Sequence, residues 1–363
     1  MISFSLTEEQ QMLVDAVKRY AERDLRKSLR EADESGHLPD DLIGTGWELG
    51  LIPSSIPETY GGFGEHSALT GVLFAEELAW GDLSAAINLL APNLLVTPIL
   101  EYGTDRQKQT LLPQFCDMEF VSATAAMMEP RLTFDPHNLQ TTAVRQNGHY
   151  ILNGQKAYVP LAADAKQLLV YANENGQTQA FIVSSDAPGL SIGPREKNMG
   201  LKALPTYTLK LEDCKIDAAN KIGGDDGINF AHLQSYSHVA LAAMAVGVAR
   251  ASYEYALEYA KEREAFGEPI ASRQAIAFML AEMAIEIDAT RLMVWEAAWM
   301  LDQGKDAVKE AAMAKRYADD MVMQVTDGGV QVLGGHGYIR EHPVELWLRN
   351  GRGFAVLDTV TMV

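Results

Sequence analysis

The sequence contains few cysteines and no long apolar run. Only two cysteines occur among 363 residues, Cys116 and Cys214, and neither belongs to a CxxC pair or a Cys/His cluster. We therefore expect no metal site, and two isolated thiols fit a reducing cytoplasm. The uncharged run Val239–Ala249 is far shorter than the ~20 residues that span a bilayer. The first residues also lack the pattern of a signal peptide, so we expect no membrane association.

Basic residues are scarce relative to acidic ones. Thirty Lys and Arg against 49 Asp and Glu give a net charge of −19. Such a surface repels phosphodiester backbones and anionic membranes, and no basic cluster compensates, so nucleic-acid binding is not expected. An anionic ligand would need a local pocket of hydrogen-bond donors.

The glycine-rich motifs of common nucleotide folds are absent. Neither GxGxxG nor GxxxxGK[ST] occurs, and helices and strands do not alternate as βαβ units, which argues against a Rossmann sheet. Any nucleotide cofactor must therefore be held in another way.

The first third of the chain has helical patterns. Thr7 and Gln10 have the spacing of a capping box, followed by apolar residues at helical intervals. Further helices are predicted over 68–80, 84–102 and 105–112, and the Pro- and Gly-rich segment 57–64 is predicted to be a loop.

Short strands are predicted in the middle of the chain. Asn147-Gly148 separates two strand-like segments, which is the pattern of a β-hairpin with a two-residue turn. Strands are also expected at 167–171, 180–183 and 207–211. Long amphipathic helices then follow over 231–262, 272–301 and 306–333, which is typical of a helical bundle.

The expected fold class is therefore α+β and mainly α. We expect an N-terminal helical domain over 1–120, a central β-barrel-like domain over 121–228 and a C-terminal helical bundle over 229–363.

Five segments, in the same order, resemble motifs of the acyl-CoA dehydrogenase family. They are residues 6–13 (LTEEQQML), 57–64 (PETYGGFG), 153–156 (NGQK), 263–274 (REAFGEPIASRQ), and 331–338 (QVLGGHGY) with 343–345 (PVE). The resemblance covers the whole chain. It implies the family's fold and its reaction, in which a carboxylate removes the α-proton of an acyl-CoA thioester and the β-hydride passes to FAD.

In this family each FAD is shared between two subunits, and the residues that serve the neighbouring subunit's FAD are all present. Arg263 occupies the position of the guanidinium that pairs with the diphosphate, a role suited to its planar set of donors. The other positions bind the adenosine end or approach the diphosphate closely, and they are occupied by Phe266, Gln274, Gln331, Gly334 and Gly335.

The residues that hold the flavin ring within the same subunit differ from the family pattern. The family's (T/S)EPxAGSD is MEPRLTFD here, so Met128 replaces a hydroxyl that faces the flavin. The family's WITN becomes YVPL, so Tyr158 replaces the flanking tryptophan and Pro160 replaces a threonine that hydrogen-bonds the flavin. Either backbone contacts suffice for this chain to bind FAD, or its own ring site is weakened.

The expected catalytic base is also altered. Counting without gaps from residues 343–345, the family's glutamate falls on Asp358, whose carboxylate is drawn back by roughly 1.5 Å. A displacement of that order can cost about a hundredfold in rate unless the backbone compensates. Some family members place their glutamate near Ser237, but residues 234–238 (QSYSH) contain no carboxylate.

Two functions from different classes follow from the resemblance. The first is an acyl-CoA dehydrogenase that uses Asp358 as its base. The second is a non-catalytic subunit whose Arg263 and Gly334-Gly335 complete the FAD site of a related chain; a nitroalkane-oxidase-like enzyme is a third, minor reading. The implied partners are acyl-CoA, an electron-transfer flavoprotein as electron acceptor, and other subunits, as a homo-dimer, homo-tetramer or hetero-tetramer with a family member.

Overall fold

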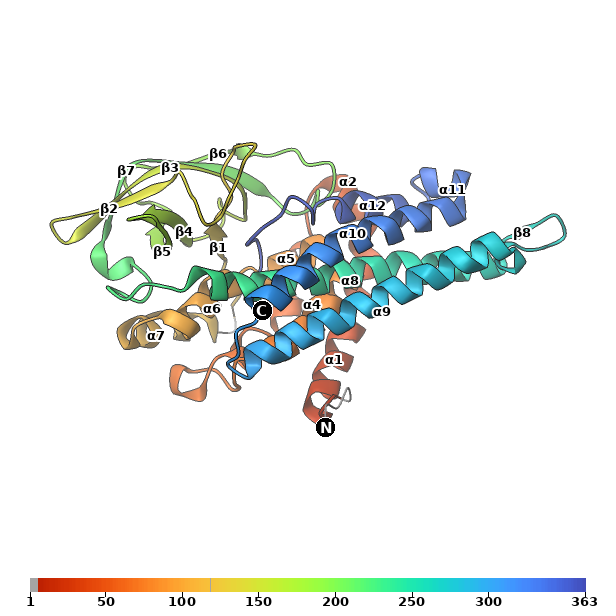
Figure 1. Cartoon of the computed structure of the whole chain (residues 1–363), viewed down its shortest axis with the longest axis horizontal. Coiled ribbons are helices and arrows are strands. Elements are labelled where there is room, and N and C mark those ends of the chain that lie inside the picture. The colour runs from red at the N-terminus through yellow and green to blue at the C-terminus, as the bar shows by residue number, and fades with distance from the viewer. Residues whose placement is uncertain (1–5, 118) are drawn as a thin grey trace.

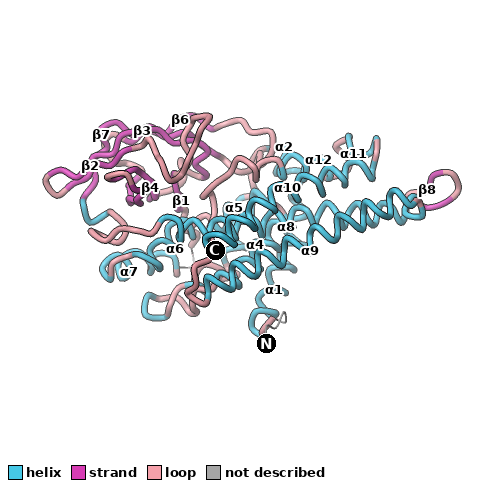
Figure 2. Tube along the Cα trace, viewed as in Figure 1, coloured by secondary structure: helices cyan, strands magenta, loops and turns pink. Residues whose placement is uncertain are grey.

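The computed structural model describes residues 6–117 and 119–363 of the chain. Helices flank a curled β-sheet (Figure 1), and Figure 2 shows the sheet gathered at one end of the molecule and the long helices extending to the other. The expected α+β, mainly helical fold class is confirmed.

The part before the sheet is helical. Its elements are α1 (Glu8–Tyr20), η1 (Ala21–Leu25), α2 (Arg26–Ser35), α3 (Asp40–Trp47), η2 (Pro53–Ser55), η3 (Glu58–Tyr60), α4 (Ala68–Gly81), α5 (Leu83–Leu90), α6 (Asn93–Tyr102), α7 (Asp105–Leu111) and η4 (Leu112–Phe115). The predicted capping box at Thr7 is present, because its hydroxyl accepts from the Gln10 backbone and the Gln10 side chain accepts from the Thr7 backbone.

The single helix predicted over 84–102 is wrong. The chain forms two helices there, α5 and α6, which are separated at Ala91 and Pro92. Proline restricts the residue before it and lacks an N–H, so a break at this point is physically expected. The periodicity of the apolar residues continues across the break because both helices are buried, which concealed the interruption.

The central sheet has seven strands. They are β1 (Ala123–Ala126), β2 (Thr142–Gln146), β3 (His149–Pro160), β4 (Gln167–Glu174), β5 (Gln177–Ser184), β6 (Leu190–Arg195) and β7 (Thr206–Asp217), in the order β1-β4-β2-β3-β7-β6 with β5 beside β4. The predicted β2–β3 hairpin is present, and Asn147 and Gly148 both have the positive φ that a two-residue turn requires.

Long helices follow the sheet. After η5 (Ala218–Asn220) come α8 (Phe230–Glu262), the short strands β8 (Glu264–Ala265) and β9 (Glu268–Pro269), η6 (Ile270–Ser272), α9 (Gln274–Asp302), α10 (Val308–Leu333), α11 (Gly335–Tyr338) and α12 (Val344–Gly351). Helix α8 packs against α4, α9 and α10 and is the centre of the helical part.

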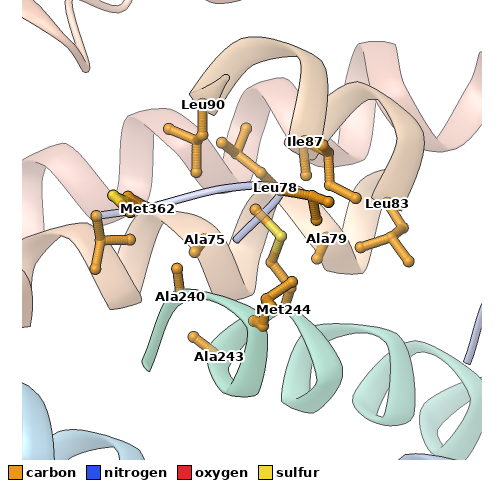
Figure 3. Packing of buried hydrophobic residues seen from close by; sticks show 14 of the residues in the cluster. Ala75, Leu78, Ala79, Leu83, Ile87, Leu90, Ala240, Ala243, Met244 and Met362 are labelled. Atoms are coloured by element: carbon orange, nitrogen blue, oxygen red, sulfur yellow. The ribbon is translucent and has the colours of Figure 1, made fainter. Parts of the chain in front are cut away.

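Small residues let α4 and α8 approach closely. A Cβ added at Gly247 of α8 would lie 2.2 Å from the backbone oxygen of Glu76, so only glycine fits there. Figure 3 shows Met244 of α8 beneath Leu78 of α4, with Met362 from the far end of the sequence in the same buried layer.

Among the described residues no single helix is both long and apolar enough to span a bilayer. The bent pair of α5 and α6 reaches that length and composition only when taken together.

Candidate functional site

Asp358 lies beyond α12 with its carboxylate held by two neutral donors. The side-chain amide of Gln234 on α8 donates to Oδ2 at 3.0 Å, and the hydroxyl of Thr359 donates to Oδ1 at 2.9 Å. No ion pair with Asp358 occurs among the described residues. The carboxylate is therefore oriented without being neutralised by a cation.

The charge of this carboxylate acts on the buried side chains of Tyr171 and His238. Phe230 at the start of α8 packs against Tyr171 of β4 and against His137, with ring centroids 5.7 and 5.2 Å apart. Burial, followed by the charge of Asp358, raises the pKa of Tyr171, whose buried hydroxyl has no hydrogen-bond partner. Burial also lowers the pKa of His238, although Asp358 opposes that shift. Both side chains are thus held neutral beside the carboxylate.

Met128, just after β1, and Tyr158, near the end of β3, lie at neighbouring positions of the sheet. We call this part of the sheet the sheet edge. The backbone N–H of Ala157 donates to the Met128 carbonyl at 2.9 Å, which joins the end of β1 to β3. Tyr158 has φ 52° within an irregular stretch of the β3–β7 ladder and is 39% exposed. A positive φ at a bulky residue is uncommon and costs on the order of 1–3 kcal/mol. The structure therefore brings the two predicted ring-binding residues together and presents Tyr158 outward.

A buried ion pair supports this edge. Glu129 accepts from the backbone N–H groups of Gln140 and Thr141 at 2.9 and 2.8 Å and from Lys156 Nζ at 3.2 Å, and Lys156 also donates to the Met127 carbonyl. Burial alone would raise the pKa of Glu129, but Lys156 and the two N–H groups lower it below its ordinary value. Burial in turn lowers the pKa of Lys156 to about 8, although Glu129 opposes this shift.

Arg263, Gly334 and Gly335 line one pocket of about 540 Å³. Tyr259 and His336 also line it, joined by a hydrogen bond between the phenol oxygen and Nδ1 at 2.9 Å. Arg263 is exposed and has no ion-pair partner in the described part of the chain. Its guanidinium is free to bind an anion.

Gly334 has a backbone conformation that other residues avoid, with φ 59° and ψ −128°. A Cβ added at Gly334 or at Gly335 would meet no other atom within 4 Å. Protein packing therefore does not explain these glycines, and the open space above them is a cradle for a ligand that approaches the backbone closely.

The remaining predicted residues of this set are also on the surface. Phe266 forms the turn between β8 and β9 with φ 58° and is 97% exposed. Gln274 begins α9 and Gln331 lies in the last turn of α10, and both are exposed. Apart from the Arg273 guanidinium, whose Cζ lies 5.9 Å from its ring centroid, this phenylalanine faces outward from a strained turn, which makes it a candidate contact for another molecule.

The two sets of predicted residues lie far apart in one chain. The β8–β9 hairpin and α11 form one end of the molecule, and the sheet that carries Met128 and Tyr158 forms the other (Figure 1). The two sets therefore do not line one pocket within a single chain.

Sequence reasoning missed Tyr171, which was predicted only as part of a strand. Its position near Asp358 depends on long-range packing against Phe230, and no local sequence signal marks it.

Known proteins resemble this chain over nearly its whole length. Residues 7–119, 124–214 and 231–358 match the acyl-CoA dehydrogenase N-terminal, middle and C-terminal domains, respectively. The chain is 35% identical to a probable acyl-CoA dehydrogenase of Bacillus subtilis, covering 97% of this chain and 94% of that one. It is 33% identical to the CarC subunit of the caffeyl-CoA reductase–Etf complex of Acetobacterium woodii, covering 98% and 96%. Butyryl-CoA dehydrogenase from Megasphaera elsdenii has a similar structure, with a TM-score of 0.90 and 32% identity over 98% of this chain and 95% of that one.

The fold and these matches define a flavoprotein oxidoreductase of the kind that acts on acyl-CoA thioesters. The chain belongs to the acyl-CoA dehydrogenase family.

The family's FAD can be tested against the residues present. At the hairpin end the unpaired Arg263 and the open cradle of Gly334 and Gly335 suit a diphosphate. At the sheet edge Met128 offers no hydroxyl and Pro160 no hydroxyl or N–H. The fit is therefore good at one end of the cofactor and reduced at the other.

Proposed function

We propose that this protein is an FAD-dependent acyl-CoA dehydrogenase that desaturates an acyl-CoA thioester between its α and β carbons, with Asp358 as the catalytic base. The observation that supports this most is the half-buried carboxylate of Asp358, held by Gln234 and Thr359 without a cation. A carboxylate that is oriented but not neutralised can accept a proton from carbon, whereas one paired with Arg or Lys is a weaker base.

The residues around Asp358 keep this base oriented and its surroundings uncharged. Gln234 and Thr359 each use one lone pair of the carboxylate and leave others free to receive the α-proton. Neutral His238 and Tyr171 add no charge that would compete for the carboxylate. Phe230 and Tyr171 form an apolar wall, which excludes water and strengthens electrostatic interactions inside the site.

FAD, when bound, supplies the acceptor for the β-hydride. Arg263, Phe266, Gln274, Gln331, Gly334 and Gly335 would hold its diphosphate and adenosine in the neighbouring subunit, and Met128 and Tyr158 would contact the ring in their own subunit. This division follows from the positions of the two sets at opposite ends of the chain.

An oligomer is part of this proposal. Helix α9 carries an exposed apolar stripe with a spacing of seven residues: Phe278, Ile285, Leu292 and Trp299. Apolar residues repeated every seven positions are typical of a helix that packs along a partner helix. We therefore propose a homo-dimer or homo-tetramer, or a hetero-tetramer with a family member. The A. woodii relative, a subunit of an Etf complex, supports an electron-transfer flavoprotein as the electron acceptor.

A second candidate is a subunit that is not catalytic by itself. Met128 and Pro160 weaken the ring site, while all six residues that would serve a neighbouring chain are present. Such a chain would complete the FAD site of a related subunit through Arg263 and the Gly334-Gly335 cradle.

The domain division at residues 120 and 228 and a cytoplasmic location complete the proposal. Cys116 and Cys214 are both free thiols, which suits a reducing compartment.

The Asp358→Asn variant tests the proposed base. The amide cannot accept the α-proton, so reduction of bound FAD by an acyl-CoA should be lost, whereas Asp358→Glu should retain or increase the rate because it lengthens the reach. We would follow flavin absorbance in anaerobic stopped-flow experiments with butyryl-CoA and lauroyl-CoA. Unchanged reduction in Asp358→Asn would remove Asp358 from the mechanism.

A further inference from the structure

A second pocket, of about 670 Å³, lies where four helices meet. Its lining comes from α2, the end of α4, the middle of α8, and α12 with the segment before it. It shares no lining residue with the pocket of Arg263 and Gly334. Figure 1 shows α2 beside α12, and an ion pair between Arg30 and Glu345 joins these two helices. A volume of this size is typical of sites for small molecules.

The guanidinium of Arg26, on α2, lies within cation–π distance of two tryptophan rings in this pocket. Its Cζ is 3.8 Å from the ring centroid of Trp80 on α4 and 4.7 Å from that of Trp347 on α12. Arginine stacks on aromatic faces, while its N–H groups point outward in the plane of the guanidinium. The two rings therefore hold Arg26 in place and leave the edge of its guanidinium for hydrogen bonds.

Arg26 has no counter-ion within the chain. The neighbouring Arg30 pairs with Glu345 at 2.5 Å. Arg340 pairs with Asp33 at 3.2 Å. Arg26, in contrast, makes no ion pair or hydrogen bond within residues 6–117 and 119–363, and its Nε is buried without a partner. Burial lowers the pKa of Arg26 to about 10, so its guanidinium is still charged at neutral pH. A buried charge without a partner is costly, and a bound anion would remove that cost.

The other charged residues of the pocket restrict the charge of such an anion. Glu254 and Glu341 line the pocket, and exposed Lys27 adds one cation. Glu254 already accepts from the indole N–H of Trp80 at 2.7 Å and lies 3.6 Å from Nε of Arg250. These two acids would repel a polyphosphate, whereas a single carboxylate matches the two parallel N–H groups at the edge of one guanidinium.

The rest of the lining is apolar or aromatic. Leu29 and Ala251 are buried, and Pro343 and Tyr255 complete the wall next to the two indole rings. Aromatic rings prefer to pack against other rings, so these walls suit a flat aromatic body better than a sugar or a peptide backbone.

We propose that this pocket is a binding site for a small aromatic carboxylate, separate from the FAD site and from Asp358. The carboxylate pairs with the edge of the Arg26 guanidinium, and the ring lies against Trp347 and Tyr255. Such a ligand contacts helices from both sides of the sheet in the sequence, so its binding stabilises the packing of α2 and α4 against α8 and α12.

Calorimetric titration of the full-length chain with 2-naphthoate tests the proposed ligand class. The neutral analogue 2-naphthamide has the same rings without the charge and should bind at least about tenfold more weakly, because a hydrogen bond to a charged group is lost. The dianion 2-naphthyl phosphate should also bind more weakly. Tighter binding of either analogue than of 2-naphthoate, or no binding of 2-naphthoate at millimolar concentrations, would overturn the proposal.

The Arg26→Gln variant tests the proposed site. It should weaken 2-naphthoate binding at least about tenfold and leave 2-naphthamide binding unchanged, since only the charged contact is removed. Arg26→Lys, which keeps the charge without the planar edge, should have an intermediate affinity. Arg263→Ala, in the other pocket, should bind 2-naphthoate as the unmodified protein does. Equal affinity in Arg26→Gln and the unmodified protein would place 2-naphthoate elsewhere.

Thermal unfolding distinguishes a ligand site from a purely structural role of Arg26. Saturating 2-naphthoate should raise the melting temperature of the unmodified protein but not that of Arg26→Gln, whereas a structural arginine would give the same ligand-induced shift in both. If Arg26→Gln does not fold, Glu341→Lys replaces it, because this exposed position faces the pocket and a cation there should tighten 2-naphthoate binding. Glu9→Lys, at an exposed residue of α1, is its control. Equal 2-naphthoate affinity in these two lysine variants would contradict the site.

Discussion

The hairpin end and the sheet edge of this molecule differ in how their site residues relate to the fold. At the hairpin end Arg263, Phe266 and Gly334 are exposed, and none of them is packed into the core of the chain. At the sheet edge the supporting Glu129–Lys156 pair is intact and buried, while Met128 and Pro160 stand where the family has hydroxyls. The scaffold of a binding site and its ligand contacts can therefore be retained or lost independently.

This contrast also separates two kinds of constraint. Glu129 is needed by the fold, because it pairs with the buried Lys156. Phe266 is exposed and has an unfavourable positive φ, and Arg273, 5.9 Å from its ring centroid, is its cation–π neighbour. We propose that a contact with another molecule explains the cost of this conformation.

The largest expected effect is on stability and concerns the buried Glu129–Lys156 ion pair at the sheet edge. Glu129→Gln leaves the fully buried Lys156 without its counter-charge, which should destabilise the protein by about 3–5 kcal/mol in urea unfolding. The exposed pair of Lys210 and Glu212 provides the matched control, and Glu212→Gln should change stability by about 0–1 kcal/mol.

The same pair predicts a pH dependence. The folded-state pKa of Glu129 is lowered, so its contribution to stability is complete above the ordinary glutamate pKa and is lost as the pH falls through the folded-state value. The stability difference between the unmodified protein and Glu129→Gln should therefore shrink in acid. A difference that stays constant from neutral pH to pH values well below the ordinary glutamate pKa would show that Glu129 is not ionised in the fold.

The next effect concerns the free guanidinium at the hairpin end. Arg263→Ala should weaken FAD binding by about 1.5–3 kcal/mol, the value of a hydrogen bond to a charged group, or roughly 10- to 150-fold. The melting temperature of the FAD-free protein should not change, because Arg263 has no ion-pair partner among the described residues. Arg316→Ala, at an exposed arginine on α10, is the control. Equal FAD affinity in both variants would exclude Arg263 from the cofactor site.

Alanine substitutions at Gly334 and Gly335 should separate the effect of backbone strain on stability from the effect of ligand contact on FAD binding. Gly334→Ala should lower stability by about 1–3 kcal/mol because φ 59° and ψ −128° are unfavourable for alanine. Gly335→Ala has no positive φ to strain and meets no protein atom, so it should weaken FAD binding without lowering stability. Thermal unfolding and FAD titration distinguish them, and a destabilised Gly335→Ala would mean that the cradle is part of the packing.

The smallest effect is a gain at the sheet edge. Met128→Thr combined with Pro160→Thr returns two hydroxyls and should strengthen FAD binding by about 1–3 kcal/mol in total. Met127→Thr, at the adjacent buried methionine, should lower stability with no gain in FAD affinity. If the double variant binds FAD no more tightly than the unmodified protein, backbone groups already make the hydrogen bonds that the flavin ring needs.

The sequence predicted the order of the elements and most helices and strands, because capping residues, the Asn147-Gly148 turn and apolar periodicity are local signals. It did not predict the break at Pro92, since both flanking helices are buried and their apolar patterns merge. It also did not predict α2, α3, β1, β6, α11 or α12, each of which is at most ten residues long.

The candidate site was predictable only where motifs are contiguous. Residues 263–274 and 331–338 could be recognised as contiguous sequence motifs. The structure brings Arg263 and Gly334 into one pocket. The surroundings of Asp358 could not, because Gln234, Tyr171 and His238 come near it only through tertiary packing across long sequence separations.

The central claim is that one active site needs the hairpin end of one chain and the sheet edge of another. Differently tagged Asp358→Asn and Arg263→Ala chains would be co-expressed, and the mixed oligomer isolated and assayed for reduction of FAD by acyl-CoA. At an FAD concentration that saturates the unmodified protein but not Arg263→Ala, Asp358→Asn alone should be inactive and Arg263→Ala alone should have little activity. In the mixed oligomer, the Arg263→Ala chain keeps its own Asp358 and receives the intact Arg263 of its neighbour, so activity should return. A mixed oligomer of verified composition that remains as inactive as the two parent variants would contradict the account.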